Sequence, residues 1–368
     1  MQITEVRAHH IRIPYDAGVA SFKQGASAIA AVDIVLVEVS TDAGLTGWGD
    51  AWGYVCPRST ATAIDEMVAP QARGQEAPGA AGIPAFMERI QRNLHLFGRY
   101  GITMFALSGL DIALWDLAAR AEGVPLHRLL GGRRRERIPA YASLLRIGDP
   151  RLVAGECEAA LAKGYAAIKL HETTVPPVLA AREAIGEGVP LMVDLNCPMD
   201  GAAAIAFAHA VRAAAPMFLE EPVWPPEDFS TLAKVRRDGG LPVAAGENAC
   251  TVHQFRQMLE AGAVSHAQPS VIKVGGITEY LRVAELADSM GVRLAPHSPY
   301  FGPGLLATLQ LMSLREDGTF VEVFYMNREA CLWDGRIGID TAGTIAVPDG
   351  PGLGYEPDPA VMERYRVG

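Results

Sequence analysis

Leu191-Met192-Val193-Asp194-Leu195-Asn196 is the first of three segments in which a short apolar run ends in a carboxylate. The other two are Phe218-Leu219-Glu220-Glu221-Pro222 and Ala245-Gly246-Glu247-Asn248. The spacing is 26 residues from Asp194 to Glu220 and 27 residues from Glu220 to Glu247. One parallel strand, one helix and their two loops take about that many residues. The pattern therefore predicts consecutive βα units whose acids meet at the C-terminal rim of a barrel, where active sites of such barrels lie.

Three carboxylates at one rim repel each other unless a cation lies between them. Hard oxygen ligands from separate strands suit Mg²⁺, so we expect Asp194, Glu220 and Glu247 to be metal ligands. Each acid taken alone could instead be a solvated loop residue or a helix cap. Glu221 must point away from Glu220, because neighbouring strand residues face opposite sides, and it needs a partner outside the metal shell. By the same rule Asn196 shares a face with Asp194.

Composition narrows the class of protein. The 368 residues are 49% hydrophobic and 20% charged, which is enough for a large core and two domains. The net charge of −10 argues against nucleic acid or an anionic membrane as partner. No apolar run reaches the roughly 18 residues of a membrane span, and the N-terminus lacks the regions of a signal peptide. Five scattered cysteines without a CxxC pair indicate a reducing compartment, so we expect a cytoplasmic protein.

The first 125 residues are expected to form an α+β domain. Antiparallel strands are predicted up to about residue 50, interrupted by a Gly/Ser/Ala-rich loop, Asp16–Ala28, that suits a mobile flap. A helix over Met104–Leu117 is apolar on most faces, so it is predicted to lie buried between domains. Its two acids, Asp111 and Asp116, are interpreted as structural. The basic turn Pro125–Arg137 is taken as the domain joint.

Residues 126–330 show a regular alternation of short apolar strands and Ala-rich helices. Eight strands in this order predict a (β/α)₈-type barrel, and residues 331–368 are expected to return to the N-terminal domain. The predicted strands are Ile138–Ser143, Tyr165–Leu170, Leu191–Asn196, Met217–Glu221, Val243–Glu247, Val264–Ser270, Val292–His297 and Phe320–Phe324.

Further polar residues stand at the ends of the other predicted strands. They are Tyr141 and Ser143 on the first, Lys169 and His171 on the second, Ser270 and Lys273 on or after the sixth, His297 on the seventh and Glu322 on the eighth. A lone histidine or lysine is more often structural, and His266, low in its strand, is interpreted as a satisfied core histidine. The shared rim makes Lys169, His171 and His297 catalytic candidates. A cation aided by Lys169 would stabilise the charge that develops when a base removes the proton next to a carboxylate.

Taken in this order, the motifs resemble the enolase superfamily, in its mandelate racemase/muconate lactonizing enzyme branch. The resemblance covers essentially the whole chain. It includes Leu107-Ser108-Gly109-Leu110-Asp111-Ile112-Ala113-Leu114-Trp115-Asp116, Leu129-Leu130-Gly131-Gly132, Glu220-Glu221-Pro222, Gly246-Glu247-Asn248, Lys273-Val274-Gly275-Gly276 and Pro296-His297. It implies an α+β capping domain over a modified (β/α)₇β barrel, with Mg²⁺ on the three acids. It also implies an even-numbered homo-oligomer and a small-molecule carboxylate substrate, with specificity set by the flap and the loop Trp52–Arg58.

The residues expected to contact substrate follow from that resemblance and from the rim. They are Tyr141, Ser143, Asn196, Ser270, Lys273 and Glu322 on the barrel side, and Phe22, Trp52, Tyr54 and Tyr300 near the loops. Asn248 and His297 are more typical of the racemase and acid-sugar dehydratase side of the branch than of the muconate side.

The sequence departs from the family pattern at two positions. The second-strand motif is commonly Lys-x-Lys, whereas here it is Lys169-Leu170-His171. On the sixth strand the racemase-like members have an Asp that hydrogen-bonds the strand-seven histidine, and this chain has Ser270. Because a serine supplies no negative charge, His297 should be a weaker base and perform better as a general acid. Glu322 matches the acid that bonds the substrate carboxylate, which requires it to be protonated or bridged through a partner.

The predicted reaction is a Mg²⁺-dependent β-elimination of an acid sugar or its lactone, as a dehydratase or a cycloisomerase. His171, or else Lys169, would take the α-proton and His297 would protonate the leaving group. The alternative is a racemase or epimerase in which His171 and His297 are bases on opposite faces. A third hypothesis is a binding or regulatory protein that keeps the metal but has lost the chemistry.

Overall fold

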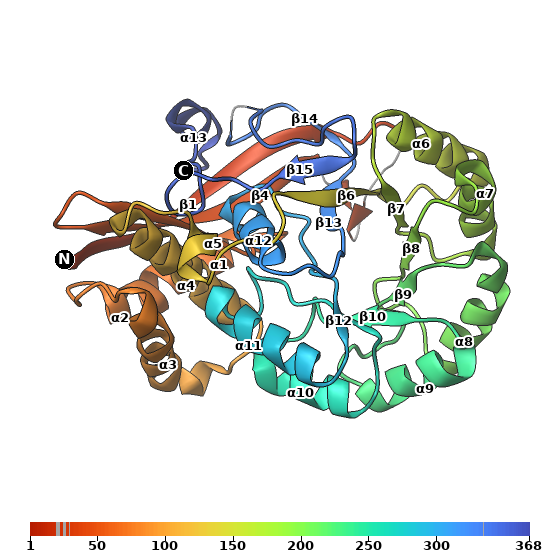
Figure 1. Ribbon diagram of the computed structural model, residues 1–368, viewed down its shortest axis with the longest axis horizontal. Coiled ribbons are helices and arrows are strands. Elements are labelled where there is room, and N and C mark those ends of the chain that lie inside the picture. Colours follow the sequence, from red (N-terminus) through yellow and green to blue (C-terminus); the bar gives the residue numbers. More distant parts are fainter. Residues whose placement is uncertain (20–22, 25–26, 29, 334) are drawn as a thin grey trace.

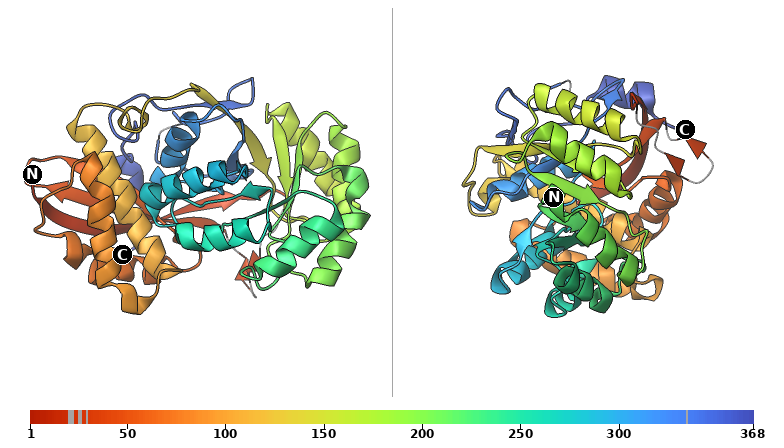
Figure 2. Two further views of the ribbon diagram at one scale, coloured as in Figure 1. Left: turned by 60° about the horizontal axis from the view of Figure 1, so that its bottom comes forward. Right: turned by 90° about the vertical axis from the view of Figure 1, so that its right-hand side faces the viewer.

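The computed structural model describes residues 1–19, 23–24, 27–28, 30–333 and 335–368. The predicted substrate contact Phe22 and much of the predicted flap lie outside the described residues. Figure 1 shows an antiparallel sheet with helices on one side of the molecule and a ring of strands surrounded by helices on the other. Figure 2 shows the two parts side by side along the longest axis.

The N-terminal part is a three-stranded meander covered by helices. Strands β1 (Ile3–Asp16), β4 (Ala31–Thr41) and β5 (Thr46–Ala51) pair antiparallel, and a short hairpin of β2 (Lys23–Gln24) and β3 (Ser27–Ala28) lies off this sheet. The helical elements that follow are α1 (Pro57–Ala63), η1 (Ile64–Val68), α2 (Ala69–Ala72), η2 (Ala80–Gly82), α3 (Ile83–Asn93), η3 (His95–Phe97), α4 (Ile102–Ala121) and α5 (Leu126–Leu129).

Helix α4 packs directly on strand β5 because that strand lacks side chains at two contact points. A Cβ at Gly47 would stand 2.2 Å from the carbonyl oxygen of Ala113, and one at Gly49 would stand 2.0 Å from that of Gly109. The prediction that no stretch is apolar enough for a membrane span was wrong for α4, which meets that criterion by length and composition. Its apolar stretch is 89% buried inside the fold, which accounts for its composition.

The ring is a parallel sheet in the order β12-β11-β10-β9-β8-β7-β6-β13, which confirms the modified barrel. Its strands are β6 (Arg137–Ser143), β7 (Ala167–Leu170), β8 (Leu191–Asp194), β9 (Phe218–Glu220), β10 (Val243–Ala245), β11 (His266–Ala267), β12 (Arg293–Leu294) and β13 (Val321–Phe324). A helix follows each of the first seven strands: α6 (Pro150–Ala162), α7 (Val175–Ile185), α8 (Gly201–Ala210, extended by η4, Arg212–Ala214), α9 (Phe229–Gly239), α10 (Thr251–Glu260), α11 (Gly276–Ser289) and α12 (Pro303–Ser313).

Several strands are shorter than predicted, for local backbone reasons. Strand β8 ends at Asp194 because Asn196 adopts a positive φ of 52°. Strands β11 and β12 contain only two residues each, instead of the predicted Val264–Ser270 and Val292–His297. Pro269 and Pro296 follow these strands, and proline has no N–H to extend a ladder. No pairing between β12 and β13 is seen among the described residues.

The C-terminal segment joins both parts. Strand β14 (Asn327–Arg328) pairs with β1, and β15 (Thr344–Ala346) pairs with β6. Helix α13 (Pro359–Tyr365) packs near β1 (Figure 1). The predicted boundaries at residues 125 and 330 remain a prediction.

Two fully buried acids of α4 connect the parts, which confirms their structural interpretation. Asp116 accepts hydrogen bonds from the backbone N–H of Trp48 (2.8 Å) and Leu353 (2.6 Å) and from Nε of Arg120 (2.7 Å). Asp111 accepts the backbone N–H of Thr278, at the start of α11, at 3.0 Å. Asp111 thereby holds the N-terminal part against the barrel, and Asp116 ties it to the C-terminal segment.

His266 lies in the barrel core, as interpreted, but it is not fully satisfied. Its ring packs 5.1 Å from that of Phe218, and Nδ1 is 3.0 Å from Oγ of Ser265. Nε2 has no partner among the described residues. Burial lowers the pKa of His266 to about 4, because the charged ring would lose its hydration.

Candidate active site

Three carboxylates stand together where β8, β9 and β10 end. The pairing of Asp194 with Glu220 across β8 and β9 places both at the same height. Glu247 follows β10 by two residues, after Gly246 turns the backbone with a φ of 137°. One oxygen from each of the three acids lies within 4.8 Å of the others. The 26- and 27-residue spacing thus brought the acids together as predicted.

The geometry of the three acids fits a divalent cation. Oε2 of Glu220 is buried and has no hydrogen-bond partner among the described residues. Burial, and then repulsion by Asp194, raises the pKa of Glu220 well above its ordinary value. A buried carboxylate oxygen without a donor is costly, and a cation shared with Asp194 and Glu247 would remove that cost. Oxygen donors on separate strand ends are typical of a hard divalent ion.

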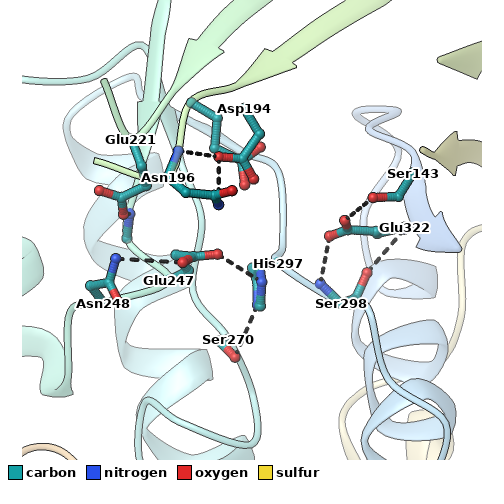
Figure 3. A network of polar contacts seen from close by, with 12 residues as sticks. Ser143, Asp194, Asn196, Glu221, Glu247, Asn248, Ser270, His297, Ser298 and Glu322 are labelled. Atoms are coloured by element: carbon teal, nitrogen blue, oxygen red, sulfur yellow. Dashed lines mark hydrogen bonds and ion pairs between the residues drawn. The ribbon is translucent and has the colours of Figure 1, made fainter. Parts of the chain in front are cut away.

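Neighbouring groups orient the ligand oxygens. The backbone N–H and Nδ2 of Asn196 both donate to Oδ1 of Asp194 at 2.9 Å, which leaves Oδ2 for the site (Figure 3). Glu221 points away, as predicted, and accepts the backbone N–H of Gly246 at 3.0 Å. Cys197 donates to its other oxygen at 3.5 Å. Asn196 therefore orients Asp194 from outside the cluster of three acids.

Lys169 is fully buried among the acids. Its Nζ lies 3.0 Å from Oε1 of Glu220, 3.4 Å from Oδ2 of Asp194 and 2.9 Å from Oε1 of Glu322. Burial alone would lower the pKa of Lys169, but Glu220 and Glu322 raise it well above its ordinary value. The surroundings thus favour a charged ammonium that stabilises anions over a neutral base.

Glu322 is held as a carboxylate. Besides Lys169, it accepts the hydroxyl of Ser143 at 2.7 Å and the backbone N–H of Ser298 at 3.4 Å (Figure 3). Burial raises its pKa, but Lys169 and His297 lower it below its ordinary value. Of the two expected states, protonated or bridged through a partner, this geometry favours the bridged one.

His171 is oriented by a backbone carbonyl. Its Nδ1 lies 2.6 Å from the carbonyl oxygen of Leu144, which can only accept a hydrogen bond, so Nδ1 carries the proton. Nε2 faces the site and lies 3.2 Å from Oδ2 of Asp194, a carboxylate oxygen that can only accept a hydrogen bond from it. The ring stacks on Phe324, with centroids 6.2 Å apart. The carbonyl of Leu144 keeps a proton on Nδ1, so Nε2 is the nitrogen that can exchange a proton with a substrate.

His297 faces the same three acids from the other side. Its Nε2 lies 2.8 Å from Oε2 of Glu247, and its Nδ1 lies 3.4 Å from Oγ of Ser270 (Figure 3). Ser270 is in turn 2.5 Å from the hydroxyl of Tyr300, which donates to the carbonyl oxygen of His297. The ring of Trp52 packs 5.9 Å from the imidazole. Both imidazoles therefore present Nε2 to the carboxylate cluster.

A cavity of about 400 Å³ opens above the cluster, between the barrel rim and strands β4 and β5. Of the predicted site residues, it is lined by His171, Asp194, Asn196, Glu247, His297, Glu322, Trp52, Tyr54 and Tyr300. Tyr141, Ser143, Lys169, Glu220, Ser270 and Lys273 do not line it. They lie behind its wall, where Tyr141 packs against Lys169 and the Nζ of Lys273 lies 4.7 Å from the ring centre of Trp52.

Sequence reasoning missed several lining residues. Asp50 is buried beside the cavity and accepts the backbone N–H of Gly304 at 3.0 Å. Burial raises the pKa of Asp50 to about 7. Arg146 lies three residues beyond the end of β6, and Phe301 and Phe324 stack 6.0 Å apart at the wall. Arg146 and Phe324 had a usable signal, because Arg146 comes three residues after one predicted strand end and Phe324 is the last residue of another predicted strand.

Comparisons with known proteins agree with this fold and site. Residues 12–131 match the mandelate racemase/muconate lactonizing enzyme N-terminal domain, and residues 152–361 match the enolase C-terminal domain-like family. The chain therefore belongs to the mandelate racemase/muconate lactonizing enzyme branch of the enolase superfamily, a family of enzymes.

Individual relatives are similar over nearly their full length. The chain is 31% identical to the D-galactarolactone cycloisomerase of Agrobacterium fabrum, over 100% of this chain and 99% of the relative. It is 31% identical to a D-galactonate dehydratase of Ralstonia nicotianae, over 90% and 91% of the two chains. A solved structure of a racemase from Streptomyces coelicolor with bound magnesium is similar with a TM-score of 0.85 and 28% identity, over 99% and 100% of the chains.

Proposed function

We propose that the enzyme is a Mg²⁺-dependent lyase that performs β-elimination on an acid sugar or its lactone. The observation that carries the proposal is the placement of two imidazole Nε2 atoms beside one carboxylate cluster. Nε2 of His171 lies 3.2 Å from Asp194, and Nε2 of His297 lies 2.8 Å from Glu247. The named relatives, a cycloisomerase and a dehydratase of acid sugars, support the same reaction class.

Mg²⁺, when bound by Asp194, Glu220 and Glu247, would supply positive charge to the carboxylate oxygens of the substrate. The oxygen-only donor set favours it, and so does the magnesium in the related racemase structure. Lys169 adds a fixed positive charge beside the same acids, where negative charge develops as the α-proton leaves.

The two histidines have different parts in the proposed reaction. Nε2 of His171 takes the proton from the α-carbon. The electron pair of the broken C–H bond then forms the new C–C double bond. The C–O bond at the β-carbon breaks, and the leaving oxygen takes the Nε2 proton of a doubly protonated His297, which becomes neutral with its remaining proton on Nδ1. With a hydroxyl as leaving group, water departs and the enol tautomerises to a 2-keto acid. With a lactone, the ring opens and the leaving oxygen stays in the product.

A racemase or epimerase is the second candidate, because the same two imidazoles could exchange protons on opposite faces of the α-carbon. A reaction in D₂O with Mg²⁺ and a library of acid sugars and lactones separates the two, read by NMR and mass spectrometry. Elimination gives a keto acid, whereas 1,1-proton transfer gives deuterium at Cα of recovered substrate without elimination.

Two variants test the assigned roles. His297→Asn should still exchange the α-proton but lose elimination, because only the protonation of the leaving group is removed. His171→Asn should lose both. Mg²⁺ binding without exchange or turnover across the library would contradict the proposal and favour a protein that has lost the chemistry.

A further inference from the structure

One charged residue of the cavity wall has no part in the proposed chemistry. Arg146 stands in the loop between β6 and α6 and lines the cavity together with His171. Within the described part of the chain, no carboxylate lies within ion-pair distance of its guanidinium. Its Nε donates to the carbonyl oxygen of His171 at 2.8 Å. The two terminal NH₂ groups remain for another acceptor.

The loop that carries Arg146 is held firmly in place. Oε1 of the buried Glu172 accepts the backbone N–H of Ile147 at 2.8 Å and of Gly148 at 3.0 Å. The hydrogen bond from His171 to the carbonyl of Leu144 adds a third contact between the same two loops. A guanidinium on a loop held in this way loses little additional freedom when it binds a ligand.

The other acids of the cavity wall do not balance this charge. Asp33 already pairs with Nε2 of His10 (2.6 Å) and NH1 of Arg12 (3.2 Å). Glu322 pairs with Lys169. Asp194 and Glu247 belong to the cation site, and burial raises the pKa of Asp50 to about 7, so that it is only partly ionised near neutral pH. Arg146 therefore brings an unmatched positive charge to the wall.

We propose that Arg146 is a subsite for a second carboxylate, so that the preferred substrates are dicarboxylic acid sugars or lactones that keep a free carboxylate. This inference rests on the proposed function. The planar guanidinium fork matches a carboxylate through two parallel hydrogen bonds, which a neutral CH₂OH group cannot reproduce. A sugar acid with only one carboxylate would leave the terminal NH₂ groups of Arg146, an exposed residue at the cavity wall, to water.

The test compares substrates that differ only at the far end. Galactarate carries a carboxylate where galactonate carries CH₂OH, and glucarate and gluconate form a second pair. We expect wild-type kcat/KM with Mg²⁺ to be at least about tenfold higher for the diacids. Arg146→Gln should lower kcat/KM for the diacids about 10- to 100-fold and for the monoacids less than about threefold. Arg146→Lys should lie between wild type and Arg146→Gln, because it keeps the charge but not the fork.

The matched control is Arg151→Gln, an exposed arginine at the start of the neighbouring helix α6, which should leave both substrate classes unchanged. An equal loss on both classes in Arg146→Gln would overturn the subsite, since it would show that Arg146 only positions His171. A wild-type preference for monoacids would also overturn it.

A binding measurement separates this inference from the proposed reaction. If the wild type turns over neither class, thermal shift with galactarate or galactonate in saturating Mg²⁺ still decides the role of Arg146. If galactarate stabilises the wild type and Arg151→Gln but not Arg146→Gln, the result supports the subsite, even though the proposed reaction has failed. Equal stabilisation of all three proteins overturns the subsite.

Discussion

Oγ of Ser270 and the hydroxyl of Tyr300 lie 2.5 Å apart, directly behind the imidazole of His297. The single proton of Tyr300 goes to the carbonyl oxygen of His297, so Ser270 must donate its own proton to Tyr300. Only lone pairs of Ser270 then remain for Nδ1 of His297, which must carry a proton. Two neutral side chains thereby fix a proton on Nδ1, without the negative charge that an aspartate would add in the racemase-like pattern.

Removing either hydroxyl of the Ser270–Tyr300 pair should impair the orientation of the His297 imidazole more than it impairs substrate binding. We expect Ser270→Ala and Tyr300→Phe each to lower kcat about 10-fold or more with a small change in KM, because the imidazole can rotate or change tautomer. The double variant should lose little more than either single variant, since the two hydroxyls act through one chain of hydrogen bonds. Steady-state kinetics of the three variants measures this.

Ser265→Ala is the matched control, because its hydroxyl donates to the carbonyl oxygen of Val243 in the barrel wall and has no contact with His297. Partial recovery of kcat in Ser270→Asp would support a positioning role. Additive losses in the double variant would contradict the shared chain of hydrogen bonds.

Mg²⁺ should stabilise the folded enzyme, because it relieves the repulsion among Asp194, Glu220 and Glu247. At a Mg²⁺ concentration 100 times the Kd, the expected gain in unfolding free energy is about 3 kcal/mol. Glu220→Gln should weaken Mg²⁺ binding and remove most of this gain, while its metal-free form should be at least as stable as metal-free wild type. Thermal unfolding with and without EDTA measures both effects.

Glu227→Gln, an exposed acid between β9 and α9, serves as the control and should respond to Mg²⁺ as the wild type does. A Mg²⁺-induced rise in Tm that is unchanged in Glu220→Gln would remove Glu220 from the ligand set.

His266 should make the barrel sensitive to acid. Its pKa is lowered to about 4 in the folded state, against an ordinary value of 6.5. Between pH 6.5 and 4 the unfolded chain therefore binds a proton at His266 that the folded chain does not bind. The free energy of unfolding falls as the pH decreases through this range. The full effect is about 3 kcal/mol. His266→Gln should lose less unfolding free energy than wild type between pH 7.5 and 4.5.

Denaturant unfolding at the two pH values gives this difference. The exposed His253→Gln on α10 controls for the loss of a histidine and should keep the wild-type pH dependence. Parallel pH profiles for His266→Gln and wild type would contradict the assignment.

Asp116 should be one of the most sensitive structural positions. Asp116→Ala leaves the backbone N–H groups of Trp48 (part-buried) and Leu353 (buried) without an acceptor and removes the carboxylate that Nε of Arg120 contacts. We expect a loss of about 3–5 kcal/mol in unfolding free energy. Glu122→Ala, at the exposed end of the same helix, should change stability by less than about 0.5 kcal/mol. Equal stability of both variants would show that this junction is not important.

The sequence by itself determined the barrel, the cluster of three rim carboxylates and the two rim histidines. The reason is that a parallel βα unit has a nearly constant length and strand side chains alternate, so Asp194, Glu220 and Glu247 must recur on one rim. Motif order added the family, because several motifs, such as Glu220-Glu221-Pro222 and Gly246-Glu247-Asn248, mark strand ends, whereas Leu107–Asp116 lies on helix α4. Local backbone geometry was less predictable, and the early ends of β8, β11 and β12 show this.

Only the tertiary structure decided the hydrogen bonds that give these residues their states. Ser270 meets Tyr300 across 30 residues, Arg146 meets the carbonyl of His171 across 25, and Asp50 meets Gly304 across 254. Each contact depends on the conformation of a loop at the barrel rim, and the periodicity of the sequence does not predict loop conformation. The tautomers of the two histidines and the unpaired charge of Arg146 follow from these contacts, because proton positions are set by the nearest donors and acceptors.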